Sequence, residues 1–344
     1  MSRRALTFGR SAAVTLCLAL GCHPAAGGRQ VSQGPGSQGP SAPALQVAAG
    51  AAAERDGAIL ALRPILVTER SEYYAITYRS SGLRVNGFLG RPRGAGQHPA
   101  VIFNRGGNRQ FGLLDPRVLS EYVEAGYVAV GSQYRGNGGS EGREAMGGAD
   151  VEDVLSLVPL LRALPDVDAA RVAMVGYSRG GMMTYLALRE EARSGRHAIR
   201  AAATVGGVAD QAAMLERRPE MLPVFLATIG CEPSECPEDY RARSAVYWAG
   251  ELDVPLLLLH GEADDRVPVE QARRVAQVMA AAGREVKLVT YPGDDHGLSA
   301  HRFGRPDILR FFGERLGMSP ETYAEETLAP ALRDVIQRWP APAE

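Results

Sequence analysis

The sequence of 344 residues lacks several features that identify a class of protein directly. It has no excess of charge, because 38 Lys and Arg residues nearly balance 39 Asp and Glu residues and leave a net charge of −1. That balance, without any run of like charges, argues against a nucleic-acid partner. There is also no internal repeat of fixed period, and no apolar run approaches the roughly 20 residues that cross a bilayer as a helix. The hydrophobic fraction is nevertheless 45%, which is enough for a large buried core.

Cysteine is scarce as well. Of the four cysteines, Cys17 and Cys22 lie near the N-terminus, and Cys231 and Cys236 lie in the segment GCEPSECPED. Two thiols are too few to close a structural zinc site, and we expect neither a metal nor a cofactor. We expect a disulfide between Cys231 and Cys236 if the chain is exported. A free pair of thiols is the alternative, because the sequence does not reveal whether their geometry allows a bond.

The N-terminal residues have the pattern of an export signal. A basic segment, MSRR, precedes the apolar stretch SAAVTLCLAL, and the sequence LALGC then ends at Cys22. This resembles the signal of a bacterial lipoprotein, in which the cysteine is lipidated, although Ala19 stands where leucine is usual. The resemblance implies that residues 1–22 are a signal and that a lipid on Cys22 anchors the exported protein to a membrane. Plain secretion, to the periplasm or outside the cell, and an uncleaved segment are the alternatives.

The remaining chain divides into a tether and a folded domain. Residues 23–57 are rich in Gly, Ser, Gln, Pro and Ala and have almost no large apolar side chains, so we expect a disordered tether. From residue 58 to 344, short apolar runs such as PAVIFN and RVAMVGY alternate with segments of helical periodicity. This alternation predicts an α/β fold, with a mostly parallel sheet and helices on both faces. Residues 208–248 interrupt the alternation and are expected to form a lid over the strand ends.

The segment RVAMVGYSRGGMMTYLAL contains the strongest functional motif. Its residues Gly176-Tyr177-Ser178-Arg179-Gly180 have the pattern Gly-x-Ser-x-Gly at a predicted junction of strand and helix. A sharp turn there needs small residues two positions before and after the serine, and it exposes the hydroxyl. It also places the N–H of Arg179 at a helix N-terminus, where it can stabilise an oxyanion. We therefore predict that Ser178 is a nucleophile, with a purely structural glycine turn as the alternative.

A serine nucleophile needs a base, and the base needs an acid that orients it. In this fold class the acid and then the histidine follow the serine along the chain. The segments LLLLHGEADDRVP and YPGDDHG each follow a predicted strand. With QYRGNGGSEG, they resemble the catalytic domain of the prolyl oligopeptidase (S9) family of serine hydrolases, which has the α/β-hydrolase fold. The resemblance extends from about Phe88 to Leu316 and assigns the acid to Asp264 and the base to His296.

Other residues compete for these roles. Asp265 is the alternative acid, and His301 is the alternative base. His260, Glu262 and Asp264 alternate along a strand end in a row that could hold a metal ion. The triad accounts better for Asp264, so we expect no metal there.

The second oxyanion donor is expected from the loop after PAVIFN. The large S9 peptidases place a tyrosine just before the glycines of this loop, and its hydroxyl helps to hold the oxyanion. Arg105 stands in that position here. We expect a backbone N–H of Arg105 or Gly106 to take over. The Arg105 side chain could instead bind a substrate carboxylate or form a salt bridge.

Residues 149–165, ADVEDVLSLVPLLRALP, are expected to form a helix. Asp150 is the candidate for its N-cap, and Pro159 should kink it. For Arg135, in QYRG, we expect an ion pair with Asp150 or Asp153 rather than a contact with substrate.

The sequence therefore predicts an exported serine hydrolase that works through an acyl-enzyme. The family resemblance favours a peptidase that acts on small peptides. Two departures favour a carboxylesterase of small acyl esters instead: Arg105, and the absence before this domain of the β-propeller that gates the large S9 peptidases. A binding lipoprotein without catalysis is the remote alternative. The oligomeric state does not follow from the sequence.

Overall fold

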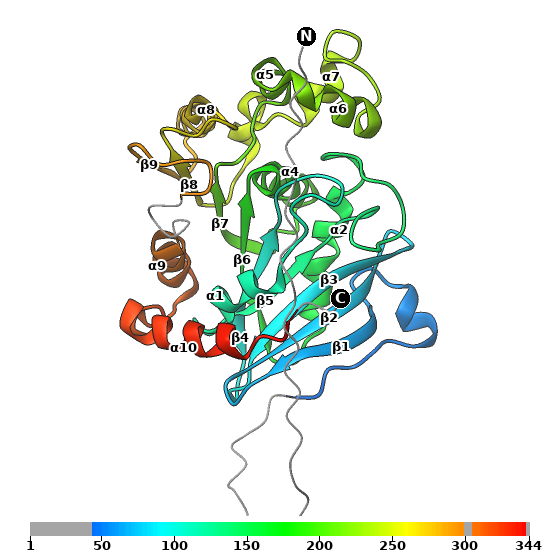
Figure 1. The fold of residues 1–344 in the computed structure, drawn as a ribbon, viewed down its shortest axis with the longest axis vertical. Coiled ribbons are helices and arrows are strands. Elements are labelled where there is room, and N and C mark those ends of the chain that lie inside the picture. The colour runs from blue at the N-terminus through cyan, green and yellow to red at the C-terminus, as the bar shows by residue number, and fades with distance from the viewer. Residues whose placement is uncertain (1–42, 299–304, 342–344) are drawn as a thin grey trace, which may run out of the picture. The chain divides into compact units, whose positions relative to one another are not determined.

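Within residues 43–298 and 305–341, which the computed structural model describes, nine strands pair in one mixed sheet (Figure 1). They are β1 (Ile59–Val67), β2 (Ser71–Ser80), β3 (Leu83–Pro92), β4 (His98–Asn104), β5 (Val128–Ser132), β6 (Val167–Tyr177), β7 (Ile199–Val205), β8 (Leu256–Gly261) and β9 (Val286–Tyr291). Their order is β1-β2-β3-β5-β4-β6-β7-β8-β9. Pairing is antiparallel along β1-β2-β3-β5 and parallel from β5 through β4 to β9. All described residues belong to one compact unit, Pro40–Glu344.

The central strands are covered on both faces. In the register between β4 and β6, Val101 lies opposite Ala173 and Ile102 lies opposite Met174. Val101 and Ala173 belong to one hydrophobic core cluster, and Ile102 and Met174 belong to the other. Successive side chains of a strand alternate between faces, so a strand covered on both faces needs a continuous apolar run. The predicted α/β fold with a mostly parallel sheet is confirmed.

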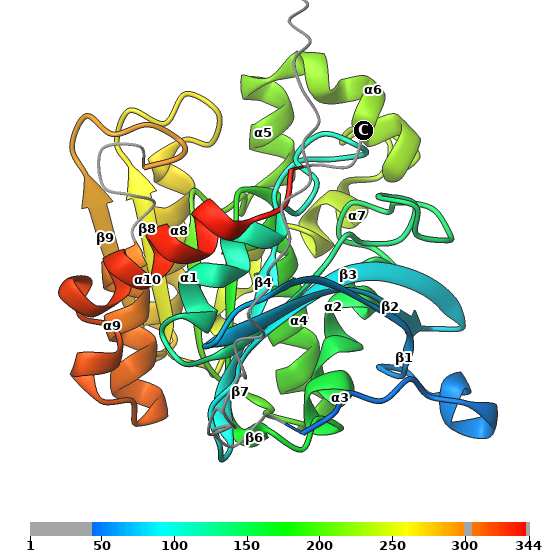
Figure 2. The same ribbon diagram turned by 60° about the horizontal axis from the view of Figure 1, so that its bottom comes forward.

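Helices pack on both faces of the sheet (Figure 2). The face that contains Val101 is covered by α1 (Ser120–Val123), α9 (Arg305–Leu316) and α10 (Glu325–Arg338). The face that contains Ile102 is covered by α2 (Val151–Leu155), α3 (Leu157–Arg162), α4 (Arg179–Ser194) and α8 (Val269–Ala281). In the part of the chain that the structure describes, no helix combines the length and the apolar character needed to cross a membrane.

The helix expected over residues 149–165 is divided into α2 and α3 at Ser156. Pro159 has no N–H to donate to the carbonyl of Leu155, four residues earlier, so the helix is interrupted there. Asp150 precedes α2 but makes no capping hydrogen bond to it. Its carboxylate pairs instead with the guanidinium of Arg179, at 2.6 Å. The expected cap is therefore wrong, because a buried cation takes the carboxylate.

The predicted tether is described only from residue 43 onward, and residues 43–57 lie against the folded unit. The guanidinium of Arg91 donates to the carbonyl oxygen of Pro43 at 2.7 Å, and Leu45 packs against the core. These contacts hold the end of this segment on the domain. The predicted signal, residues 1–22 with Cys22, lies outside the described residues.

Residues 208–248 contain three short α-helices, α5 (Gln211–Arg217), α6 (Leu222–Thr228) and α7 (Pro237–Ala242), at the top of the view in Figure 1. Between α6 and α7, Cys231 and Cys236 are joined by a disulfide, with their Cα atoms 6.1 Å apart. The Tyr240 hydroxyl donates to the carbonyl oxygen of Cys231 at 2.9 Å. The disulfide and this hydrogen bond hold the connection between α6 and α7 closed.

Candidate active site

The turn between β6 and α4 holds Ser178 in a strained backbone conformation. Its φ is 55° and its ψ is −121°, a region that residues with side chains seldom occupy. The neighbouring glycines make the turn possible. A Cβ on Gly176 would overlap the carbonyl oxygen of Gly180, and a Cβ on Gly180 would overlap the carbonyl oxygen of Asn104. The segment therefore has the strand–turn–helix geometry that presents a serine hydroxyl at the edge of the sheet.

Replacing Gly180 with alanine is expected to lower the free energy of unfolding by about 3 kcal/mol or more. The new methyl group would meet backbone atoms, which cannot rotate away. Helix propensity alone predicts the opposite sign, since alanine is favoured over glycine by about 1 kcal/mol. Urea denaturation measures the change. Gly94→Ala is the control, because a Cβ there would meet only the ring of His98, at 3.6 Å. Equal denaturation midpoints for the two variants would contradict the steric argument.

Asp264 and His296 come from the turns that follow the neighbouring strands β8 and β9. His296 Nδ1 lies 2.7 Å from Asp264 Oδ2. Asp264 Oδ1 accepts the N–H groups of Arg266, at 2.9 Å, and Val267, at 2.8 Å. Although burial alone would raise it, hydrogen bonds from His260 and His296 hold the pKa of Asp264 well below its usual range. The carboxylate is therefore ionised at neutral pH and fixed in its orientation towards His296.

His260 is a partner of Asp264 that the sequence analysis missed. It is fully buried, and its Nε2 lies 2.8 Å from the carbonyl oxygen of Val267 and 3.2 Å from Asp264 Oδ2. Because both neighbours are acceptors, the proton of a neutral His260 resides on Nε2. In the described residues His260, Glu262 and Asp264 form no metal-binding cluster, and Glu262 accepts a hydrogen bond from Thr290 instead. The alternation of His260 with Asp264 was the available signal, and it marks a shared hydrogen bond.

Ser178 and His296 line the same cavity, which has a volume of about 530 Å³. The end of β7 lies between them. The N–H of Ser178 donates to the carbonyl oxygen of Val205 at 2.9 Å. The next residue, Gly206, packs so closely that a Cβ on it would lie 3.1 Å from His296 Nδ1 and 3.2 Å from Asp264 Oδ2. The three residues of the predicted triad thus lie together at the C-terminal ends of the parallel strands.

The loop after β4 runs beside Ser178. A Cβ on Gly106 would lie 3.1 Å from the Cβ of Ser178, so the backbone of this loop faces the serine. The N–H of Arg179 is the first of helix α4, and N–H groups of a first turn have no acceptor within the helix. The N–H groups of Gly106 and Arg179 therefore belong to segments that lie beside Ser178.

The side chain of Arg105 does not line the cavity. It is 2% exposed, and its guanidinium donates to the carbonyl oxygens of Gln133 and Gly106, each at 2.9 Å. The guanidinium also lies over the ring of Tyr134, 5.0 Å from its centroid. The structure supports neither alternative considered for this side chain, a salt bridge or a substrate carboxylate. Backbone carbonyls occupy its donors, and it shapes the loop.

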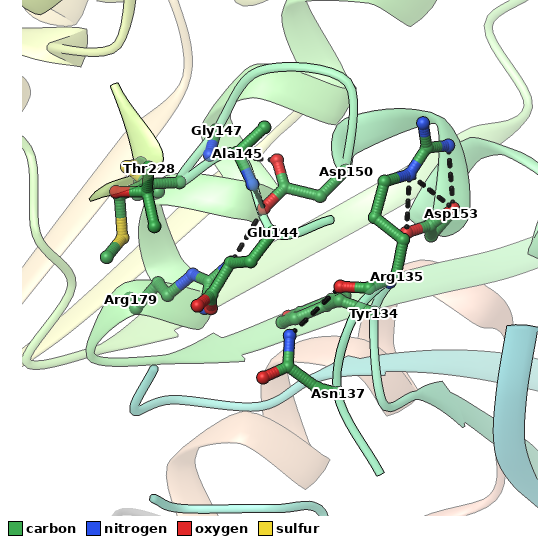
Figure 3. A network of polar contacts seen from close by, with 12 residues as sticks. Tyr134, Arg135, Asn137, Glu144, Ala145, Gly147, Asp150, Asp153, Arg179 and Thr228 are labelled. Atoms are coloured by element: carbon green, nitrogen blue, oxygen red, sulfur yellow. Dashed lines mark hydrogen bonds and ion pairs between the residues drawn. The ribbon is translucent and has the colours of Figure 1, made fainter. Parts of the chain in front are cut away.

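The other residues that the sequence singled out are Arg135, Asp265 and His301. The ion pair of Arg135 with Asp153 is confirmed, with Nη2 and Oδ1 2.8 Å apart and both side chains buried (Figure 3). Asp265, the alternative acid, is exposed. His301, the alternative base, lies outside the described residues.

Comparisons with known proteins reveal relatives along most of the folded chain. The model of the prolyl oligopeptidase family matches residues 116–318. The uncharacterized peptidase YtmA of Bacillus subtilis is 32% identical over 223 residues, which cover 65% of this chain and 85% of that protein. Acylamino-acid-releasing enzyme 1 of Oryza sativa is 29% identical over 214 residues, which cover 58% of this chain and 27% of that protein.

A solved structure is also similar to this chain. The uncomplexed acylaminoacyl peptidase of Pyrococcus horikoshii is similar with a TM-score of 0.63 and 26% identity, over 76% of this chain and 44% of that one. This chain thus matches less than half of that structure. The family match covers more than half of this chain and includes Ser178, Asp264 and His296. The chain therefore belongs to the prolyl oligopeptidase family, peptidase family S9, and contains its α/β-hydrolase catalytic domain.

Proposed function

We propose that this protein is a serine hydrolase that cleaves its substrate through an acyl-enzyme formed on Ser178. The observation that carries the proposal is the hydrogen bond of 2.7 Å between His296 Nδ1 and Asp264 Oδ2, beside a cavity that Ser178 and His296 line together. An ionised, oriented carboxylate keeps the proton on Nδ1 and leaves Nε2 able to accept the serine proton. Membership of the family supports the same roles.

The proposed reaction follows from these positions. Ser178 Oγ attacks the substrate carbonyl carbon while His296 Nε2 takes the hydroxyl proton. The carbonyl oxygen becomes negatively charged and accepts hydrogen bonds from the N–H groups of Arg179 and Gly106. His296 then gives its proton to the departing amine or alcohol, which leaves the acyl-enzyme. Water, deprotonated by His296, then attacks the acyl carbon of the ester. The bond to Ser178 Oγ breaks, His296 returns the proton to Oγ, and the acid is released, while Asp264 stays ionised throughout.

Peptides with a large apolar group beside the scissile bond are the proposed substrates. Relatives are named as a peptidase and an acylamino-acid-releasing enzyme. Met214, Met221 and Phe225 from residues 208–248, with Met146 from the loop before α2, line the cavity. Such a wall fits an apolar side chain or acyl group, and methionine adapts its shape to several of them.

Three compounds test the substrate class: N-acetyl-phenylalanine p-nitroanilide, its alanine counterpart and p-nitrophenyl acetate. We expect hydrolysis of the anilides, with kcat/KM for the phenylalanine compound about tenfold or more above that for the alanine compound. An apolar pocket discriminates between side chains of different size by about this much or more. A proline-containing dipeptide anilide extends the series. Activity confined to the ester would reject the peptidase assignment.

A carboxylesterase is the alternative, and the position of Arg105 favours it. The residue before the loop glycines supplies no hydroxyl here, and its guanidinium is held by backbone carbonyls. The oxyanion would then depend on backbone N–H groups alone. An ester, which has a better leaving group than an amide, needs less of this stabilisation.

We also propose that the protein is exported and anchored through a lipid on Cys22. The disulfide between Cys231 and Cys236 supports an oxidising compartment, because disulfides persist there. Mass spectrometry of the mature protein should identify a lipidated N-terminal cysteine. A mature chain that retains residue 1 would contradict the proposal.

A further inference from the structure

Arg179, the residue after Ser178, has a side chain that the proposed reaction does not use. It is buried, and its guanidinium donates to the carboxylates of Glu144 and Asp150 and, at 3.2 Å, to the carbonyl oxygen of Gly107. Figure 3 shows both carboxyl groups close to Arg179. Both Nη atoms of this side chain are therefore engaged with the protein.

Glu144 connects this network to the loop after β4. Besides pairing with Arg179, its carboxylate accepts the N–H of Arg109 at 2.9 Å. Arg109 and Gly107 belong to the loop that also contains Gly106. The guanidinium of Arg179 thus holds the loop by one carbonyl and, through Glu144, by one N–H. These contacts close a ring around residues 107–109.

The loop that is held in this way is the one that faces the nucleophile. Gly106 lies so near Ser178 that a Cβ on it would be 3.1 Å from the serine Cβ. Donors of an oxyanion hole must lie within about 0.5 Å of their productive positions. A loop with two successive glycines has little stiffness of its own. Arg179 lies in the helix that contributes the other donor, so the ring of contacts fixes the two donors relative to each other.

Stability alone does not account for these charges. Although burial alone would lower it, the Asp150 and Glu144 carboxylates raise the pKa of Arg179 above its ordinary value. Buried ion pairs contribute little net stability compared with apolar side chains of similar volume. Neutralising Arg179 also does not require Glu144 to reach the backbone N–H of Arg109.

We propose that Glu144 is a positioning residue for the oxyanion hole, which fixes residues 105–109 to α4 so that the N–H groups of Gly106 and Arg179 reach the oxyanion together. The inference rests on the proposed function, since the oxyanion forms when Ser178 attacks. Glu144 does not line the cavity, so it acts on the transition state through the residues that it holds, Arg179 and the loop.

The test compares Glu144→Gln and Glu144→Ala with the same changes at Glu141. Glu141 lies in the same segment, and its carboxylate also accepts a backbone N–H, at 2.9 Å. The donor, Arg84, belongs to β3 and not to residues 105–109. For each variant we would measure kcat and KM for p-nitrophenyl acetate. The inhibition constant of a trifluoromethyl ketone, whose serine adduct has an oxyanion, gives an independent readout. Thermal unfolding reports stability separately.

Glu144→Ala is expected to lower kcat about tenfold to a hundredfold, with KM changed by less than about twofold. Loss of a whole oxyanion donor costs about a hundredfold to a thousandfold, and a misplaced donor costs less. The inhibition constant of the ketone should rise by the same factor as kcat/KM falls. Glu144→Gln keeps the shape of the side chain and an oxygen for Arg109. It should show a smaller loss in the same direction, and it carries the test if Glu144→Ala does not fold. The Glu141 variants should match the wild type.

Two results would overturn the inference. The first is that the Glu144 variants have the same kcat, and the same inhibition constant for the ketone, as the Glu141 variants. The other is an effect confined to thermal stability. Failure of the proposed function looks different, because Ser178→Ala would then retain the wild-type kcat and the wild-type affinity for the ketone.

Discussion

Replacing Ser178 with alanine is expected to lower kcat for p-nitrophenyl acetate by about 10,000-fold or more. Alanine cannot form the acyl-enzyme, and His296 is left with only water to activate. The change keeps the Cβ and therefore the packing of the turn at φ 55°. Initial rates at saturating substrate, compared with the uncatalysed rate, measure the loss.

Ser194→Ala is the matched control for this prediction. Ser194 is the last residue of the same helix, and its hydroxyl donates to the carbonyl oxygen of Glu191 at 3.1 Å. It does not line the cavity, so this variant should keep the wild-type kcat. A Ser178→Ala protein that retains more than about a hundredth of the wild-type kcat would contradict the assignment of the nucleophile.

Replacing Asp264 with asparagine is expected to lower kcat about 10,000-fold without closing the cavity. Asp264 Oδ1 accepts the N–H groups of Arg266 and Val267, while Oδ2 faces His296. We expect the asparagine oxygen to take the Oδ1 position, because the two backbone N–H groups there cannot become acceptors, whereas an imidazole can change its tautomer. The amide NH₂ then faces His296 Nδ1. Nδ1 then accepts a hydrogen bond, and the ring proton moves to Nε2. In that tautomer His296 cannot accept the proton of Ser178.

Asp265→Asn is the control. It removes the same charge from the neighbouring residue, whose side chain is exposed. Its kcat at neutral pH should stay within about twofold of the wild type, as is usual for exposed positions. The proton NMR spectrum gives a second readout, in which the signal of the His296 Nδ1 proton should disappear only in Asp264→Asn. A larger loss of kcat in Asp265→Asn than in Asp264→Asn would transfer the role of the acid to Asp265.

The position of Ser178 could be predicted from the sequence because its requirements are local. Gly176 and Gly180 have fixed spacing around it, and the strand and helix on either side are visible as an apolar run and a helical period. Asp264 and His296 also follow apolar strands, so the topology of a parallel sheet brings them to the same edge. The family resemblance then distinguished them from their acidic and histidine neighbours.

Contacts between distant residues could not be predicted in this way. Glu144 and Arg179 are 35 residues apart, and the chain has 38 basic and 39 acidic residues, so spacing alone does not select this pair. The role of His260 could not be predicted, because its carbonyl and carboxylate partners meet only in the folded chain. Strand β1 was not predicted, because Arg63 and Pro64 interrupt its apolar pattern. It is an edge strand, and an edge strand tolerates such an interruption.

The most direct test of the central claim is the site at which a fluorophosphonate labels the protein, identified by mass spectrometry after proteolysis. Such a reagent bonds covalently to a serine that a neighbouring base activates. We predict one adduct, on the peptide that contains Ser178, and its loss in His296→Ala. An adduct on another serine, or an unlabelled Ser178 in a preparation that hydrolyses substrate, would contradict the account.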